Sequence, residues 1–435
     1  MNIEIRNGYL IFPREDRILI EKKNIYIHKG IIKYNKTFSK TDRVIDVKNR
    51  VIFPGLVNAH HHIYSCLSKG IPVKTPFKNF EGILKNLWWK LDKALLEEDV
   101  TLSTVLTLQD CIRNGVTTIF DHHISTNFVE NSLNTLAEVF ENFGLNGALC
   151  FEISNRNGNE IFQKSLKENI RFIKKKKPNS LKGMIGLHAS FTLDNENLKE
   201  IKDKTENFPI HIHIAEDKID EIQCKEKYNQ TVIERLENFD LLRQNSLLVH
   251  CSNIANNEIE ILKNEKLFIV QTIDSNMNNA LNIANISKLI KNGIKTTVGT
   301  DGMSSNILKS FKNSFLFTKY QNQDPDIGFF EMKAMLLNSY KLKKAFGFPI
   351  GVLEDEPADI VIFDYKPATP LNENTFISHF IYGITESQAQ WVIKKGKILL
   401  DNFKLQITNQ YDDLIDNATR ITKKMFKRFT KSGKI

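Results

Sequence analysis

Apolar runs that each end in polar or charged residues recur eight times between residues 51 and 302, with helix-like segments between them. Near-continuous apolar runs are typical of strands buried on both faces, and their alternation with helices favours a parallel sheet. Eight strand–helix units in a stretch of this length predict the α/β class and a (β/α)8 TIM barrel. The runs are VIFPGLVNAHHH, TTIFDHH, GALCFEIS, MIGLHASFT, PIHIHIAED, SLLVHCSN, LFIVQTIDSN and TTVGTDG.

The two ends of the chain show a different pattern. IEIRNGYLIF near the start and AQWVIKKGKILLDN near the end alternate apolar and polar positions beside Asn-Gly and Lys-Gly turns, as antiparallel strands do. We expect the strands from both ends to join in one small β-domain beside the barrel. The predicted parts are a β-sandwich domain from residues 1–53 plus 345–405, a barrel from 54–344, and a helical tail from 406–435.

The tail reads as an amphipathic basic helix. Ile421, Met425 and Phe429 would fall on one side of it and pack on the protein surface, an interpretation that we prefer over membrane contact.

Composition excludes several classes of protein. The chain has 435 residues, 41% of them hydrophobic and 26% charged, as expected for a globular protein with a large core. The net charge of +9 raises the question of nucleic-acid binding. The lysines are spread along the chain, and no nucleic-acid motif accompanies them, so we predict no nucleic-acid partner.

The cellular setting follows from the cysteines and from the apolar segments. The five cysteines are odd in number and form no CxxC pair, which suits a reducing cytosol. The N-terminus lacks the layout of a signal peptide, and no apolar stretch of about 18 residues is present. We therefore expect a cytoplasmic protein with no membrane partner.

Histidines mark the candidate chemistry. Nine of the 11 lie at or near the ends of the predicted barrel strands, and the C-terminal ends of these strands form the catalytic face of a TIM barrel. Neutral imidazole is the commonest metal ligand in proteins. The nine are His60, His61, His62, His122, His123, His188, His211, His213 and His250.

His60 and His62 stand two residues apart on a predicted strand, so their side chains point to the same face. Both can then reach one metal ion, whereas His61 points to the other face. An isolated pair with this spacing is more often a surface or core pair. The preceding PGLVNA, which leads directly into a barrel strand, favours a metal site.

His213 ends the fifth run, and Glu216 follows three residues later. This arrangement offers a metal ligand and a carboxylate that can move protons between water and substrate. The alternative for Glu216 is a surface or helix-capping acid. His211 shares the face of His213 but sits deeper, where we expect it to pack inside the barrel.

His250 ends the sixth run and Asp301 the eighth, within GTDG. A turn aspartate is the common alternative for Asp301. Taken together, however, His60, His62, His213 and Asp301 predict three imidazoles and a carboxylate at one barrel mouth. Such a set leaves a position open for water and is typical of catalytic metal sites, where the ion lowers the pKa of water from about 15.7 toward about 7.

These segments resemble the amidohydrolase superfamily, in its cytosine deaminase and chlorohydrolase-like branch. The resemblance covers almost the whole chain, and more narrowly it is similar to SsnA-type aminohydrolases, which are associated with selenium metabolism. The superfamily motifs are PGLVNAHHH, HIHIAED, LVHC, GTDG and ADIVIFD, and the narrower matches include LWWKLDKAL, DHH and GLHASFTL.

The resemblance implies one divalent metal ion, with zinc favoured and iron as the alternative, because the fourth run ends in His188 and not in the lysine of binuclear members. It implies that Glu216 protonates a ring nitrogen and that Asp301 deprotonates water. His250 would orient the resulting hydroxide and stabilise the intermediate, His188 would contact the substrate, and ammonia would leave. Members of the superfamily often form homodimers.

Two departures bear on the substrate. Gln271-Thr272-Ile273 stands where the branch usually has His-Asn-Pro, and Asn155 stands where it tends to have Asp. Both positions lie at strand ends, so we count Gln271 among the expected substrate contacts. Trp88 and Trp89, after the first strand, either cover the pocket and stack on a planar substrate or pack a helix against the barrel.

Four functions are compatible with these residues to different degrees. The first is a hydrolytic deaminase of an amino-substituted heterocycle such as a purine or pteridine. The second keeps the fold and metal but cleaves an amide or a carbon–chlorine bond of a cyclic substrate. The third is a relative that has lost activity and only binds, which is weaker because every proposed ligand and the acid are present. The fourth is a nucleic-acid-binding protein, which is weaker because it rests on the charge alone.

Overall fold

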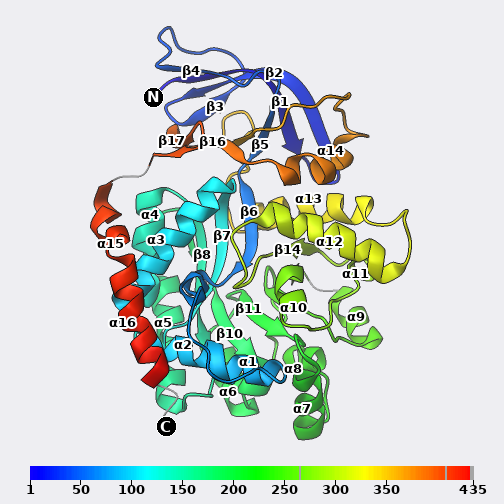
Figure 1. The fold of residues 1–435 in the computed structure, drawn as a ribbon. Helices are drawn as coiled ribbons and strands as arrows, with labels where there is room; N and C mark the ends of the chain where they lie inside the picture. The colour runs from blue at the N-terminus through cyan, green and yellow to red at the C-terminus, as the bar shows by residue number, and fades with distance from the viewer. Residues whose placement is uncertain (264–265, 407–408, 432–435) are drawn as a thin grey trace.

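The computed structural model describes residues 1–263, 266–406 and 409–431. Its central sheet has eight parallel barrel strands surrounded by helices (Figure 1), which confirms the predicted fold class. Each strand coincides with one of the eight apolar runs. The strands are β6 (Leu56–His61), β7 (Val116–His123), β8 (Asn146–Ile153), β10 (Ile185–Ala189), β11 (Ile210–Ile214), β12 (Leu247–His250), β13 (Phe268–Gln271) and β14 (Thr296–Val298), with a short β9 (Leu181–Gly183) paired to β8.

The first and last barrel strands meet just after β14. The main-chain nitrogens of Thr300 and Asp301 both donate to the carbonyl oxygen of His60, each at 3.0 Å. Asn58 on β6 donates its side-chain amide to Thr300 Oγ1 at 2.6 Å. A Cβ atom on Gly299 would lie 2.7 Å from the His60 nitrogen, so only glycine permits this approach. The closure therefore depends on residues that flank the candidate metal ligands.

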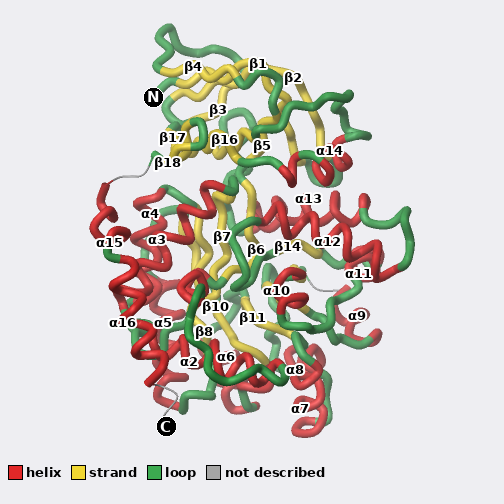
Figure 2. The backbone as a smooth tube through the Cα atoms, in the orientation of Figure 1, coloured by secondary structure: helices red, strands yellow, loops and turns green. Residues whose placement is uncertain are grey.

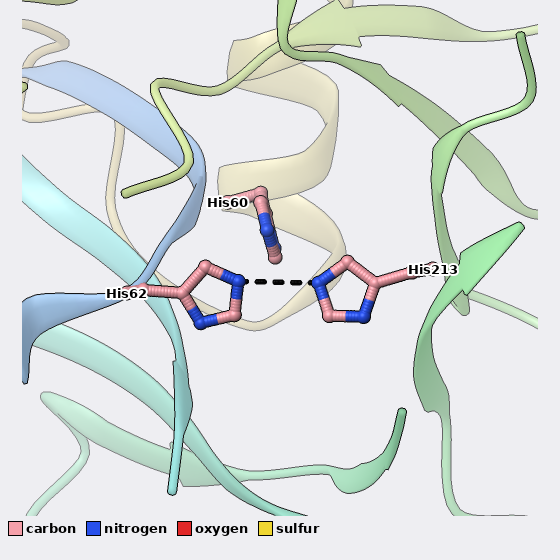
Figure 3. A group of neighbouring side chains, drawn as sticks. All are labelled: His60, His62 and His213. Carbon is pink, nitrogen blue, oxygen red and sulfur yellow. Dashed lines mark hydrogen bonds between the residues drawn. The ribbon is translucent and has the colours of Figure 1, made fainter. Parts of the chain in front are cut away.

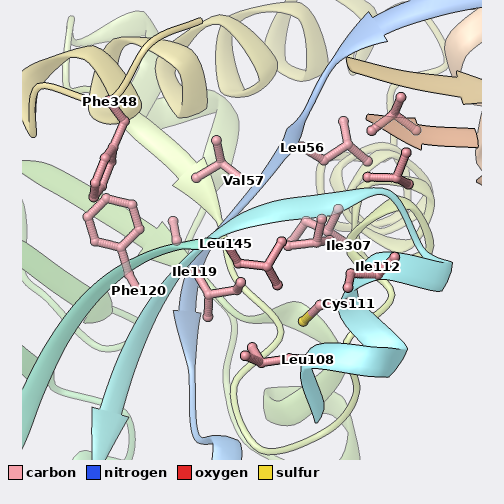
Figure 4. Close-up of a cluster of buried hydrophobic side chains, with 14 of the residues drawn as sticks. Leu56, Val57, Leu108, Cys111, Ile112, Ile119, Phe120, Leu145, Ile307 and Phe348 are labelled. Carbon is pink, nitrogen blue, oxygen red and sulfur yellow. The ribbon is translucent and has the colours of Figure 1, made fainter. Parts of the chain in front are cut away.

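Amphipathic helices cover the outside of the barrel. Leu108 and Ile112 of the first outer helix belong to the same buried hydrophobic cluster as Leu56 and Ile119 of the strands (Figure 4). The outer helices are α3 (Glu97–Arg113), α4 (Ser132–Phe143), α5 (Asn159–Lys174), α6 (Asn195–Lys204), α7 (Lys218–Tyr228), α8 (Val232–Asn238), α9 (Asn256–Lys263), α11 (Ile286–Lys291), α12 (Ile307–Asn322) and α13 (Phe329–Ala345).

Strands from both ends of the chain form a second sheet, seen above the barrel in Figure 1 and as the upper group of yellow strands in Figure 2. The N-terminal and C-terminal sets join where β15 pairs antiparallel with β5. The strands are β1 (Ile3–Pro13), β2 (Ile18–His28), β3 (Ile31–Lys33), β4 (Arg43–Asp46), β5 (Val51–Pro54), β15 (Asp359–Phe363), β16 (Ala389–Lys394), β17 (Lys397–Asp401) and β18 (Lys404–Leu405), and α14 (Phe376–Tyr382) packs beside them.

A buried ionic cluster joins this sheet to the barrel. Asp359 Oδ2 accepts from Lys343 Nζ of α13 at 2.8 Å and from Lys394 Nζ of β16 at 2.7 Å. Lys343 also donates to the carbonyl of Gly55, the residue between β5 and β6, at 3.2 Å. Burial would raise the pKa of Asp359, but the two ammonium groups outweigh it and hold the pKa at about 2. Burial lowers the pKa of Lys394 to about 8.

The C-terminal segment is helical, with α15 (Asp412–Asp416) and α16 (Ala418–Lys431). Ile421, Met425 and Phe429 of α16 are buried on one side, as their spacing predicts. Residues 407–408 and 432–435 of the predicted tail lie outside the described residues. Across the described chain, none of the helices has the length and apolar character needed to cross a membrane.

Candidate active site

Four side chains predicted to bind metal converge at the C-terminal end of the barrel. His62 Nε2 lies 3.1 Å from His213 Nε2 and 3.2 Å from Asp301 Oδ1. His60 Nε2 lies 3.5 Å from the same Asp301 oxygen. The donor atoms of the three histidines lie within 4.8 Å of one another, and Figure 3 shows the rings turned toward a common centre. We refer to these four residues as the metal-binding cluster.

Two of the rings are oriented by main-chain carbonyls. His62 Nδ1 donates to the carbonyl of His122, and His213 Nδ1 to the carbonyl of His188, each at 2.7 Å. Because a carbonyl can only accept, the proton of each neutral ring sits on Nδ1 and the lone pair of Nε2 faces the centre. When both rings are neutral, two lone pairs face each other at 3.1 Å, and among the described residues the Nε2 of His60 has no hydrogen-bond partner. This donor set fits a cation.

The charges of the cluster agree with that fit. Burial acts to raise the pKa of Asp301, but the imidazoles of His60 and His62 beside its carboxylate outweigh burial and hold the pKa well below its usual value. Burial lowers the pKa of His62, but the hydrogen bond and charge of Asp301 and the charge of Asp121 raise it to about 9. Asp301 is thus an ionised carboxylate that attracts positive charge to this point.

Glu216 and His250 face the same centre. Burial, and then the charge of Asp301, raise the pKa of Glu216 well above its ordinary value. Glu216 Oε2 lies 3.4 Å from His250 Nε2. His250 Nδ1 lies 2.9 Å from the side-chain oxygen of Asn276, whose amide nitrogen donates to the carbonyl of Asn282. The side-chain oxygen of Asn276 is thereby fixed facing His250, where it accepts the proton of Nδ1. Neutral His250 then presents the lone pair of Nε2 to the site.

Left-handed backbone occurs at two of these positions. His250 has a φ of 69° and Asp301 a φ of 54°, values that non-glycine residues rarely adopt. Such strain often gathers at functional sites, where the surrounding structure holds it in place. Here His250 is the last residue of β12, and Asp301 follows β14 after Gly299 and Thr300.

A cavity of about 600 Å³ opens beside the metal-binding cluster. Trp88, Trp89, His188, Glu216 and Asp301 all line it. The Trp89 ring lies 6.4 Å from the His188 ring, at an interplanar angle of 66°. The two tryptophans belong to a covering segment, residues 80–94, that contains α1 (Phe80–Ile83), the π-helical turn η2 (Leu84–Trp88) and α2 (Trp89–Ala94).

Gln271 and Asn155, the two positions that depart from the pattern of the family branch, do not line this cavity. Gln271 is buried and does not line the cavity; its amide donates to the main-chain carbonyl of His250 at 2.9 Å. Its amide nitrogen thus holds the strand end that carries His250, and a contact between Gln271 and substrate stays a prediction. Asn155 lines a smaller cavity of about 350 Å³, which shares Trp89 and Arg156 with the larger one.

A second polar cluster in the cavity wall escaped the sequence analysis. Arg156 Nη2 donates to Asp92 Oδ2 at 2.6 Å and to Glu152 Oε1 at 2.9 Å, and its guanidinium lies 5.1 Å from the Trp89 ring. Burial raises the pKa of Asp92 to about 7. Burial also acts to raise that of Glu152, but the charges of His188 and Arg156 lower it to about 2. Among these three charged residues, only Glu152 lies near the polar end of a predicted barrel strand, the third run, where site residues are expected.

Some polar atoms of this wall lack partners. Among the described residues, the Oδ1 of Asp92, the Nε of Arg156 and the Nε1 of Trp89 are buried without a hydrogen bond. Buried polar groups are normally paired, so such atoms in a cavity wall are available to a ligand. The wall offers two donors and one acceptor.

Comparison with known proteins gives a consistent family. A model of the amidohydrolase family matches residues 51–399. A 5-methylthioadenosine/S-adenosylhomocysteine deaminase of Caldanaerobacter subterraneus subsp. tengcongensis is 28% identical, covering 93% of this chain and 94% of the relative. A 5′-deoxyadenosine deaminase of Methanococcus aeolicus is 31% identical, covering 94% and 95%. The crystal structure of an adenosine deaminase from Xanthomonas campestris with bound zinc superposes with a TM-score of 0.82 at 18% identity, covering 97% of this chain and 98% of the other.

Proposed function

Because the chain belongs to the amidohydrolase family, as a hydrolase of carbon–nitrogen bonds, we propose that it deaminates an adenine nucleoside altered at the 5′ position. The observation that carries the chemistry is the convergence of two carboxyl groups, Glu216 and Asp301, beside three imidazoles, with the pKa of Glu216 raised well above its usual value and that of Asp301 held well below it. When the surroundings raise the pKa of one carboxyl group and lower that of another, one site supplies both an acid and a base.

Each group then has one role in the hydrolysis. Asp301 accepts a proton from the attacking water, and His250 orients that water through the lone pair of Nε2. Glu216 gives its proton to the ring nitrogen next to the reacting carbon. Water oxygen bonds to that carbon, the carbon–nitrogen bond breaks, and the amino group leaves as ammonia with the proton held by Asp301. The hydroxyl proton left on the new carbon–oxygen bond passes to Glu216, so the product carries a carbonyl and both carboxyl groups return to their starting states.

The metal-binding cluster suits one divalent ion, and we propose zinc, with iron as the alternative. Imidazole nitrogens and a carboxylate oxygen are ligands that zinc accepts, and a site with a position left open is catalytic. When bound, such an ion supplies a Lewis acid that makes water acidic near neutral pH. We propose a single ion because the fourth barrel strand, β10, carries His188 where binuclear members carry a lysine.

The nucleoside part of the proposal rests on the cavity wall. Trp88, Trp89 and His188 offer flat rings to a planar base. A ribose hydroxyl both donates and accepts, so it matches the unpaired Asp92 oxygen and the unpaired Arg156 nitrogen together. The relatives named above act on nucleosides that carry this sugar, and their names place the variation at the 5′ position.

A substrate panel tests the proposal. Zinc-loaded protein is assayed for ammonia with adenosine, 5′-deoxyadenosine, 5′-methylthioadenosine, guanine and a pterin, with Glu216→Gln as the inactive control. We expect the highest kcat/KM for a 5′-altered adenine nucleoside. Ammonia from guanine or the pterin alone would reject the nucleoside. Chloride release from a chlorinated triazine, without ammonia from any substrate, would favour the dechlorinase alternative.

The narrower resemblance to SsnA-type aminohydrolases, with its selenium association, stays a prediction, as do the cytoplasmic location and the homodimer.

A further inference from the structure

His60 is oriented differently from the other two histidines of the metal-binding cluster. His62 and His213 donate Nδ1–H to main-chain carbonyls, whereas His60 Nδ1 lies 2.8 Å from Nε2 of another imidazole, His211. An imidazole nitrogen can donate or accept. This contact alone therefore leaves open which nitrogen of His60 carries the proton.

The next contacts settle the direction. His211 Nδ1 lies 3.7 Å from Cys150 Sγ, and the Cys150 thiol donates to the main-chain carbonyl of Asp121 at 3.5 Å. A carbonyl only accepts, so the thiol proton is committed to it and the sulfur must accept from His211 Nδ1–H. Neutral His211 then has its lone pair on Nε2 and accepts Nδ1–H of His60. The lone pair of His60 Nε2 is left facing the centre.

The surroundings support this assignment. His60, His211 and Cys150 are fully buried, so bulk water does not compete for these contacts. In the reverse arrangement, the proton of His60 would sit on Nε2, on the side that faces Asp301 at 3.5 Å. A protonated Nε2 has no lone pair for an ion. The chain of contacts from Cys150 to His60 thus decides whether His60 can serve as a ligand.

We propose that His211 and Cys150 are positioning residues, which hold His60 as the Nδ1–H tautomer and so prepare its Nε2 for the metal. They reach no substrate and touch the ion only through His60. The position of His211 along its strand predicts a packing role, and the structure adds a contact with His60 Nδ1 at 2.8 Å that depends on the imidazole. This inference is independent of which heterocycle is deaminated.

Zinc affinity, measured by chelator competition, is the first test. His211→Leu removes the acceptor and should weaken zinc binding by about 10–100-fold, the usual cost of losing a partner behind a ligand. His211→Gln keeps an oxygen acceptor and should restore most of the affinity. Cys150→Ser, which can still donate and accept, should bind zinc like the unaltered protein, and Cys150→Ala should lose less than His211→Leu.

His123→Leu is the matched control. His123 is an equally buried histidine of β7, but its Nε2 contacts Ser125 Oγ at 2.9 Å and touches none of the four proposed ligands. It should lose stability and keep its zinc affinity. Unchanged affinity in His211→Leu, or an equal loss in His123→Leu, overturns the proposal.

A spectroscopic test remains decisive even where a leucine variant fails to fold. In zinc-loaded protein labelled with 15N-histidine, the resonance absent from His211→Gln identifies His211. We expect its shifts to show the proton on Nδ1. A proton on Nε2 of His211 contradicts the proposed direction and rejects the positioning role.

Discussion

Two buried polar clusters in this molecule are built on opposite principles. At the junction of sheet and barrel, Lys343 and Lys394 share one oxygen of Asp359, and only the other oxygen of Asp359 is unpaired among the described side chains of that cluster. At the barrel mouth, the Nε2 atoms of His62 and His213 face each other at 3.1 Å, and the Nε2 atoms of His60 and His250 are among the buried nitrogens without a hydrogen-bond partner in the described structure.

The difference distinguishes buried polar groups that stabilise the fold from buried polar groups that bind a ligand. Charges that are paired within the protein hold two parts of a fold in register, although their net contribution to stability is small. Polar atoms that are buried, oriented by other groups and still unpaired are kept for something the protein binds. Breaking the first kind should cost stability and spare zinc binding, and breaking the second should do the reverse.

The largest effect is expected for His213→Ala. Loss of one of three imidazoles should abolish zinc binding and all turnover, measured by metal analysis and ammonia release. In metal-free protein, His213→Ala breaks no ion pair among the described residues. Its cost in unfolding free energy should therefore be smaller than the cost of removing the charge of Asp359 from the cluster with Lys343 and Lys394. His123→Ala should retain zinc. A His213→Ala protein that keeps stoichiometric zinc would remove the distinction.

Glu216→Gln should affect catalysis alone. The amide cannot give a proton to the ring, so kcat should fall by about 10²–10⁴-fold while zinc content stays that of the unaltered protein. Ammonia release and metal analysis on the same sample measure both. Activity retained in this variant would reject Glu216 as the acid.

Asp359→Asn tests the junction cluster. Two buried ammonium groups would lose their counter-charge, so the unfolding free energy should fall by about 3–5 kcal/mol in urea titration, with zinc affinity unchanged. The matched control is Asp364→Asn, at the residue that directly follows the same strand, β15. Asp364 pairs with Arg50 at 2.8 Å but is 45% exposed, and its loss should cost at most about 1 kcal/mol. Equal costs for the two would show that the buried cluster is not structural.

The smallest effect is a pH dependence. Burial lowers the pKa of Lys394 to about 8, against an ordinary value of 10.5. Between these values the unfolded chain binds more protons than the folded protein, so stability attributable to Lys394 rises with pH. Lys394→Met should remove that rise, measured as the difference in unfolding free energy between pH 8 and pH 10. Identical slopes in both proteins would contradict the lowered pKa.

The sequence was sufficient for the barrel and for the metal-binding cluster. Eight apolar runs each became a strand, and the two-residue spacing of His60 and His62 put both on one face. These features are local, because strand alternation fixes where neighbouring side chains point. The geometry agrees with that prediction, and the assignment of the four residues as ligands stays a proposal.

Contacts between distant segments escaped prediction. Asp92 and Arg156 are 64 residues apart and meet in the cavity wall, and no local pattern pairs them. Lys343 and Asp359 come from a helix and a strand of different parts of the fold. The hydrogen bond from Gln271 to the main-chain carbonyl of His250 escaped prediction for the same reason, since a strand-end position does not reveal which main-chain group a side chain binds.

The seam between β6 and β14 has a consequence for how the protein is made. Asn58 and Thr300, bonded across it, are 242 residues apart, and His60, His62 and Asp301 lie on its two sides. While the ribosome is still translating β7 to β13, the nascent chain has only part of its ligand set. With the proposed ligands, ion loading is a late step of biogenesis, and a chain truncated before residue 301 lacks the proposed carboxylate ligand.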